Sequence, residues 1–134
     1  MAKAVHVAVG IIKRNNQIFL TKRADEAHQG GKWEFPGGKV EENETLAQAL
    51  ARELKEEVGI AINISAVADN IFDTVVHDYP EKRVCLDFVL VSDFAGEPQG
   101  CEGQVGRWFE LSELTGVDFP DANKVIVDKL LVRF

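Results

Sequence analysis

Residues 38–60 read GKVEENETLAQALARELKEEVGI, and the rest of the chain is best understood outward from this stretch. Thr45 and Gln48 have the spacing of a capping box, in which each side chain bonds the backbone amide of the other residue. Gly59 suits the left-handed position just beyond a helix end. Apolar residues recur at every fourth position, as in a helix with one buried face: Leu46, Leu50, Leu54 and Val58. The pattern predicts a helix over residues 45–58.

The predicted helix and the loop before it are strongly acidic. Glu53 and Glu57 are four residues apart, so their charges repel each other close to the negative C-terminal end of the helix. Such a helix either exposes its carboxylates to water, as many surface helices do, or binds cations. Carboxylate oxygens are ligands that Mg²⁺ and Mn²⁺ prefer. The glutamates of this region are Glu41, Glu42, Glu44, Glu53, Glu56 and Glu57.

The net charge of the whole chain has the same sign. Its 134 residues include 15 basic and 22 acidic ones, which gives −7. That balance argues against binding to long nucleic acid, which requires a positive surface. An acidic protein can still bind a small phosphorylated ligand when divalent cations lie between the two, and the glutamate-rich helix offers a place for them.

Size and composition favour one globular domain over residues 1–134. No apolar stretch approaches the roughly 18 residues of a membrane span, and the N-terminus lacks the features of a signal peptide. We therefore expect a cytoplasmic protein with no membrane partner. Cys85 and Cys101 have no metal-binding spacing, and we expect two reduced thiols in preference to a disulfide.

Strand-like segments surround the helix. Residues 4–12 are apolar and β-branched, as in a strand buried on both faces, and the turn at Asn15-Asn16 predicts a hairpin over residues 4–22. A C-terminal helix is predicted over residues 121–133, with an apolar face of Val125, Ile126, Leu130 and Leu131. Together these elements favour an α+β fold with helices packed on a sheet. Further strand-like stretches are residues 33–35, parts of 60–77, 83–92 and 105–110, and loops are expected at 24–32 and 93–104.

The small and charged residues around the first helix follow a recognisable pattern. Gly38 is followed after five residues by Glu44, and after seven more by the run RELKEEVGI at 52–60. This 23-residue pattern resembles the Nudix box, a signature of hydrolases that cleave nucleoside diphosphates linked to another group. The resemblance implies the Nudix fold, a mixed β-sheet sandwiched between α-helices. It continues through AVGII at 8–12, IFLTKRAD at 18–25, EFPGGK at 34–39, GEP at 96–98, EGQ at 102–104 and DFPDAN at 118–123.

Carried over residue by residue, the resemblance implies a metal site beside a nucleotide pocket. Arg52 and Glu44 would support the metal-binding carboxylates, and the general base would be Glu53, which we favour, or Glu102. The metal, Mg²⁺ or Mn²⁺, would be held by Glu53, Glu56, Glu57, Glu102 and the carbonyl oxygen of Gly37. The pocket would be formed by Arg23, His28, Phe35, Asn123, Val5 and Val7.

Four of these pocket residues have simpler explanations. Arg23 and His28 would ordinarily be surface residues. Phe35 could belong to the core, and Asn123 could cap the last helix, with or without offering its amide to a purine edge. His6 is offset by one residue from Val5 and Val7, so it should point to the other face of the strand, and we assign it no role.

The implied activity is Mg²⁺-dependent hydrolysis of 8-oxo-dGTP, and by extension 8-oxo-GTP, to the monophosphate and pyrophosphate. Such an enzyme removes oxidised guanine from the nucleotide pool and so prevents mutation, and we expect it to act as a monomer. Two alternatives stay open. One is a Nudix hydrolase of another nucleotide, such as a normal dNTP, CTP or a dinucleotide. The other is a Nudix-fold module that binds a nucleotide without hydrolysing it, although such a module needs neither Arg52 nor the full set of glutamates.

Overall fold

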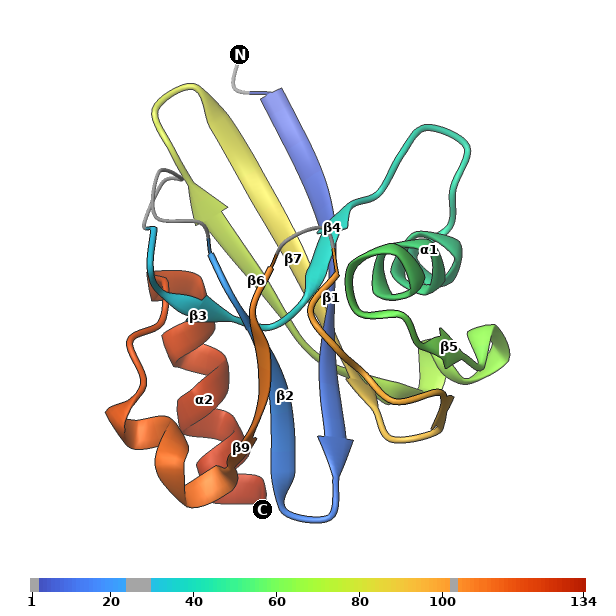
Figure 1. Ribbon diagram of the computed structural model, residues 1–134. Coiled ribbons are helices and arrows are strands. Elements are labelled where there is room, and N and C mark those ends of the chain that lie inside the picture. Colours follow the sequence, from blue (N-terminus) through green and yellow to red (C-terminus); the bar gives the residue numbers. More distant parts are fainter. Residues whose placement is uncertain (1–2, 24–29, 102–103) are drawn as a thin grey trace.

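A mixed β-sheet between two helices forms the described part of the chain, which in the computed structural model comprises residues 3–23, 30–101 and 104–134 (Figure 1). The strand order is β3-β2-β1-β7-β6, with β4 paired to β1 and β9 paired to β2. Because β1 and β7 run parallel while the other pairs are antiparallel, the predicted mixed sheet is confirmed. The strands are β1 (Lys3–Arg14), β2 (Gln17–Lys22), β3 (Trp33–Glu34), β4 (Gly37–Lys39), β6 (Ile71–Asp78), β7 (Lys82–Val91) and β9 (Gly106–Glu110).

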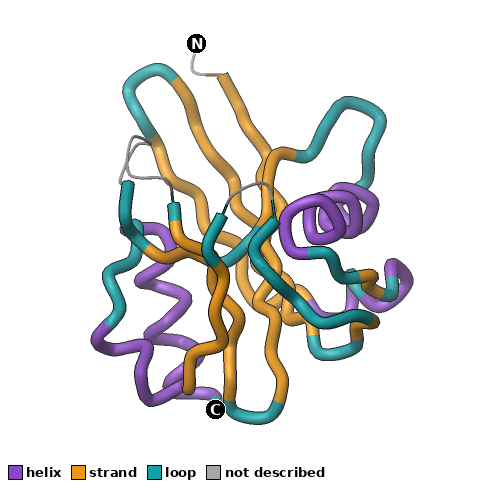
Figure 2. Tube along the Cα trace, viewed as in Figure 1, coloured by secondary structure: helices purple, strands orange, loops and turns teal. Residues whose placement is uncertain are grey.

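The two long helices, α1 (Leu46–Val58) and α2 (Asp121–Arg133), cover opposite faces of this sheet (Figure 2). Side chains alternate between the faces of a strand, so β1 contributes to both cores. Ala8 and Ile12 lie in the cluster with α1, whereas Val9 and Ile11 lie in the cluster with α2. The expected strand buried on both faces is therefore confirmed for residues 8–12.

The boundaries of α1 follow from local sequence. The Thr45 hydroxyl accepts a hydrogen bond from the backbone amide of Gln48, and the Gln48 side chain accepts one from the amide of Thr45. Gly59 ends the helix at φ 76°, a left-handed conformation that costs least for glycine. The predicted helix and both of its caps are confirmed.

Residues 60–77 contain strand-like stretches, as expected: β5 (Ala61–Ile62), which pairs with β8 (Phe94–Ala95), and β6, with the turns η1 (Ile64–Ala66) and η2 (Ala68–Asn70) between them. Other sequence-based expectations need correction. On α2, Val125 is exposed and Val127 is buried instead, since the helix docks through positions 123, 126, 127 and 130. A further short helix, η3 (Leu111–Gly116), was not expected.

The structure also bears on the cysteines and on membrane-spanning helices. Cys85 and Cys101 are free thiols, as expected. Among the helices that the structure describes, none has the length and apolar character needed to cross a membrane.

The feature that positions the functional site is a fork in the pairing of β1. Residues 7–9 of β1 pair with β4, while residues 12–14 pair with β2. Between the two, the amide of Gly10 donates to the carbonyl of Pro36 at 2.8 Å. The chain from β3 to β4 therefore passes from β2 to β1 and lays Gly37 and Gly38 beside α1.

Candidate active site

Two glycines bring the backbone of β4 into contact with the carboxylates of α1. A Cβ atom on Gly38 would lie 2.4 Å from the carboxyl carbon of Glu53, and one on Gly37 would lie 2.1 Å from the carbonyl oxygen of Ala8. The amide of Gly37 donates to Oε2 of Glu57 at 3.2 Å. At Gly37 a side chain would collide with the backbone of β1, whereas at Gly38 it would displace the carboxylate of Glu53, which explains glycine at both positions.

Arg52 fixes two carboxylates in place. Its Nε and Nη2 atoms donate to the two oxygens of Glu44 at 2.7 and 2.9 Å, and its Nη1 donates to Glu53 at 2.8 Å. Nη2 also donates to the carbonyl oxygen of Lys39 at 3.1 Å. The Arg52 hydrogen bond, followed by one from the amide of Glu41, lowers the pKa of Glu44 to about 2. Bidentate pairing of this kind orients both partners as well as attracting them.

The ionisation of Glu57 is strongly perturbed, in the opposite direction to that of Glu44. Partial burial, followed by the charges of Glu34 and Glu53, raises its pKa to about 7, against the opposing effect of the Gly37 amide. A nearby cation would stabilise the ionised form of Glu57, because the cation offsets both the cost of desolvation and the repulsion from the other carboxylates. The oxygen donors of Glu53 and Glu57 therefore fit a hard divalent cation.

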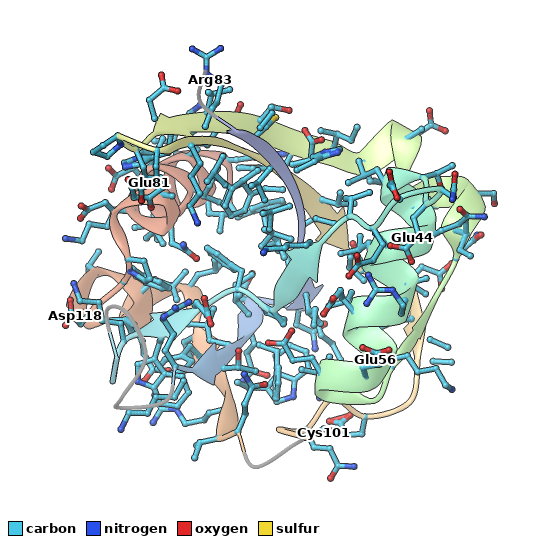
Figure 3. The ribbon with its side chains drawn as sticks, turned by 90° about the horizontal axis from the view of Figure 1, so that it is seen from above. Glu44, Glu56, Glu81, Arg83, Cys101 and Asp118 are labelled. Carbon is cyan, nitrogen blue, oxygen red and sulfur yellow. The ribbon has the colours of Figure 1, made fainter. Side chains whose placement is uncertain are left out.

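The remaining predicted ligands are placed less closely. Glu56 is 54% exposed, with one oxygen 3.6 Å from Nη1 of Arg52, and Figure 3 shows it with Glu44 along the side of α1. Within the described residues, the ligand atoms of Glu53, Glu56 and Glu57 do not gather within 4.8 Å of one another. Glu102 lies outside the described residues, and the role of the Gly37 carbonyl oxygen stays a prediction.

A cavity of about 310 Å³ lies on the other side of Gly37 and Gly38. Four of the predicted pocket residues line it, namely Val7, Arg23, Phe35 and Asn123. Val5 lies on the same face of β1 as Val7, but it is not among the described residues that line the cavity. His28 falls outside the described residues.

Asn123 joins the cavity to the core. Its side chain is buried, and Oδ1 accepts a hydrogen bond from the backbone amide of Phe35 at 3.3 Å. The N-cap of α2 is Pro120, so the alternative that Asn123 caps this helix is wrong. Phe35 is both core and cavity wall, since its ring stacks on Phe119 with centroids 5.7 Å apart.

The cavity has further lining residues that the sequence did not predict, among them Glu34, Tyr79 and Leu86. Glu34 pairs with Arg23, whose Nη1 lies 2.8 Å from Oε1, and burial raises the pKa of Glu34 against the opposing charge of Arg23. The sequence could have identified Glu34 only by its place in the EFPGGK segment at 34–39. Tyr79 and Leu86 come from β7 and the turn before it, and only the tertiary fold brings them here.

Comparisons with known proteins agree with this geometry. A relative from Escherichia coli (strain K12), named 8-oxo-dGTP diphosphatase, is 46% identical over 129 residues that cover 96% of this chain and 97% of the relative. A second protein of that strain, named CTP pyrophosphohydrolase, is 47% identical over 106 residues, covering 79% and 76%. A solved structure from work on MutT of Aliivibrio salmonicida and Vibrio cholerae superposes with a TM-score of 0.79 and 37% identity, covering 98% of this chain and all of that one. Residues 4–130 match the NUDIX domain, and the chain belongs to the Nudix family of hydrolases.

Proposed function

We propose that this protein is a Mg²⁺-dependent pyrophosphohydrolase that converts 8-oxo-dGTP into the monophosphate and pyrophosphate. The observation that carries the proposal is the shared wall at β4, where Gly37 and Gly38 line the cavity and also contact Glu57 and Glu53. A nucleotide whose base fills the cavity would direct its phosphates past these glycines toward the carboxylates. The E. coli relative named 8-oxo-dGTP diphosphatase, which matches nearly the whole chain, supports this choice of substrate.

In this mechanism the carboxylates of α1 prepare the phosphate end of the site. When bound, Mg²⁺ neutralises charge on phosphate oxygens and acidifies a water molecule. Glu53 and Glu57 would hold it, joined by Glu56 and Glu102, and Arg52 keeps Glu53 aligned by the contact at 2.8 Å. Water attacks the β-phosphorus, the bond from that phosphorus to the α–β bridging oxygen breaks, and a carboxylate takes the proton of the water. Glu53 is our preferred base, and Glu102 is the alternative.

The cavity would determine which nucleobase the protein binds. Asn123 already accepts a hydrogen bond from the Phe35 amide through Oδ1, and no hydrogen bond from its Nδ2 is found among the described residues. That donor is therefore positioned to bind an acceptor on a purine edge. Arg23 and Glu34 form a charged pair on the same wall and would orient the nucleotide.

The decisive experiment is pyrophosphate release in the presence of Mg²⁺, with 8-oxo-dGTP, dGTP and CTP compared at low substrate concentration. CTP belongs in the set because a relative of this chain carries the name CTP pyrophosphohydrolase. We expect kcat/KM to be highest for 8-oxo-dGTP by orders of magnitude. Equal values for 8-oxo-dGTP and dGTP would remove the sanitising role, and a preference for CTP would replace the substrate. No release from any of the three would leave a nucleotide-binding module.

A monomeric state and a cytoplasmic location complete the proposal. The acidic balance of −7 supports the absence of long nucleic acid as a partner. Size-exclusion chromatography with light scattering measures the first property directly.

A further inference from the structure

A second group of metal-ligating side chains lies away from the glutamates of α1. His6 on β1 pairs in register with Cys85 on β7, and Asp87 follows two residues later on the same strand. One ligand atom from each of the three, an imidazole nitrogen, a thiol sulfur and a carboxylate oxygen, lies within 4.8 Å of the other two. The Nε2 atom of His6 is 2.6 Å from Oδ2 of Asp87. Neighbouring strands of one sheet thus hold all three donors close together.

This group is separate from the nucleotide cavity. His6 lies on the face of β1 that carries Ala8 and Ile12, whereas Val7 and Val9 line the cavity on the other face. The first residues of β1 and the β6–β7 turn extend beyond α1 (Figure 1). The side chain of His6 is 42% exposed and that of Asp87 is 15% exposed, which leaves an open path from solvent.

The surroundings orient the donors in a manner typical of metal sites. The hydroxyl of Thr74, which pairs in register with Asp87 across β6 and β7, donates to Oδ1 of Asp87 at 2.5 Å. Asp87 therefore keeps Oδ2 toward His6. Outer partners of this kind fix the direction of a ligating carboxylate, and losing one typically weakens metal binding.

We propose that His6, Cys85 and Asp87 form a binding site for a divalent transition metal of the zinc class. Three protein ligands with nitrogen, sulfur and oxygen donors suit Zn²⁺ and Co²⁺, and leave a fourth tetrahedral position for water. Mg²⁺ has little affinity for a thiolate, so the site is chemically distinct from the carboxylates of α1. Burial and the charge of Asp87 raise the pKa of the Cys85 thiol, so the metal-free site holds a protonated sulfur. On binding, the S–H bond breaks, a metal–sulfur bond forms and the proton passes to solvent.

Cobalt binding tests the site directly, because a thiolate bound to Co²⁺ produces a sulfur-to-metal charge-transfer absorption. The full chain is titrated with Co²⁺ in excess Mg²⁺, which keeps the carboxylate site filled. The sequence holds two cysteines, so a thiolate signal has two possible sources. We expect the absorption in the unmodified protein and in Cys101→Ser, its loss in Cys85→Ser, and its disappearance when Zn²⁺ is added, since Zn²⁺ binds such ligands more tightly than Co²⁺.

Two further variants keep the test independent of how well Cys85→Ser folds. His6→Ala changes an exposed side chain and should weaken Co²⁺ binding by at least about tenfold, and Thr74→Val should weaken it by about tenfold through Asp87. Pyrophosphate release in Mg²⁺ should be the same in all variants, which checks folding. Absence of the charge-transfer absorption in the unmodified protein, its persistence in Cys85→Ser, or unchanged Co²⁺ affinity in His6→Ala would each overturn the proposal.

Discussion

Replacement of Glu57 by glutamine should remove a pH-dependent loss of stability from the metal-free protein. The folded protein raises the pKa of this carboxyl from 4.5 to about 7, chiefly by burial. Between these two values the folded state holds a proton that the unfolded state has released. The free energy of unfolding must therefore fall as the pH rises through this window. In Glu57→Gln there is no proton to lose, and this contribution disappears.

The magnitude follows from the same pKa. A rise from 4.5 to about 7 corresponds to about 3 kcal/mol of unfolding free energy. Glu57 is only partly buried, and solvent screening reduces the expected effect to about 1 to 2 kcal/mol. The difference in unfolding free energy between Glu57→Gln and the unmodified protein should grow by this amount, in favour of the variant, between pH 5 and pH 8.

Urea unfolding with a chelator present, followed by tryptophan fluorescence, measures this difference. Glu56→Gln is the matched control, because it removes a glutamate of the same helix at a position that is 54% exposed, and its pH profile should parallel that of the unmodified protein. Adding Mg²⁺ at pH 8 should stabilise the unmodified protein more than Glu57→Gln. Parallel pH profiles for Glu57→Gln and the unmodified protein would refute the reasoning.

Three substitutions test the rest of the site. Arg52→Lys keeps the charge but loses the planar fork that aligns two carboxylates, so kcat should fall about 10- to 100-fold in a pyrophosphate-release assay, and an unchanged kcat would contradict the alignment role. Gly38→Ala places a methyl group 2.4 Å from the carboxyl carbon of Glu53 and should abolish most turnover, whereas Gly116→Ala, with no atom within 4 Å, should be silent; equal activities would count against the contact. Asn123→Ala should reduce the preference for 8-oxo-dGTP over dGTP in kcat/KM by about tenfold, since a lost hydrogen bond in a buried site costs about 1 to 3 kcal/mol. An equal loss for both nucleotides would exclude a role in base selection.

The parts of the fold predicted from the sequence are those that local signals determine. The capping box at Thr45, the apolar spacing and Gly59 all lie within α1, and they fix both its existence and its ends. The turns between β5 and β6 have no comparable signal, because the first of them depends on the side chain of Asn63, whose Oδ1 accepts the amide of Ser65 at 3.1 Å.

Some residues of the candidate site could be predicted from local sequence, and others depend on the tertiary fold. Glu53, Glu57 and Arg52 follow from one continuous stretch of sequence, and the structure places all three against one another or against β4. Tyr79 and Leu86 could not be anticipated, because they reach the cavity only through the pairing of β7 with β1. The buried face of α2 could not be predicted either, because packing against the sheet determines which of its apolar residues are buried.

The parallel pairing of β1 with β7 also has a consequence for the order in which the protein is assembled. Every pair in this ladder joins residues about 80 positions apart, and contacts so distant form late because closing a long loop costs entropy. The β1–β2 hairpin and α1 depend on short-range contacts and can form while the chain is still being synthesised. The cavity needs Val7 and Leu86 from the two distant strands, so it closes only when β7 docks. Until then one edge of β1 stays unpaired, which makes slow docking of β7 the step at which aggregation competes with folding.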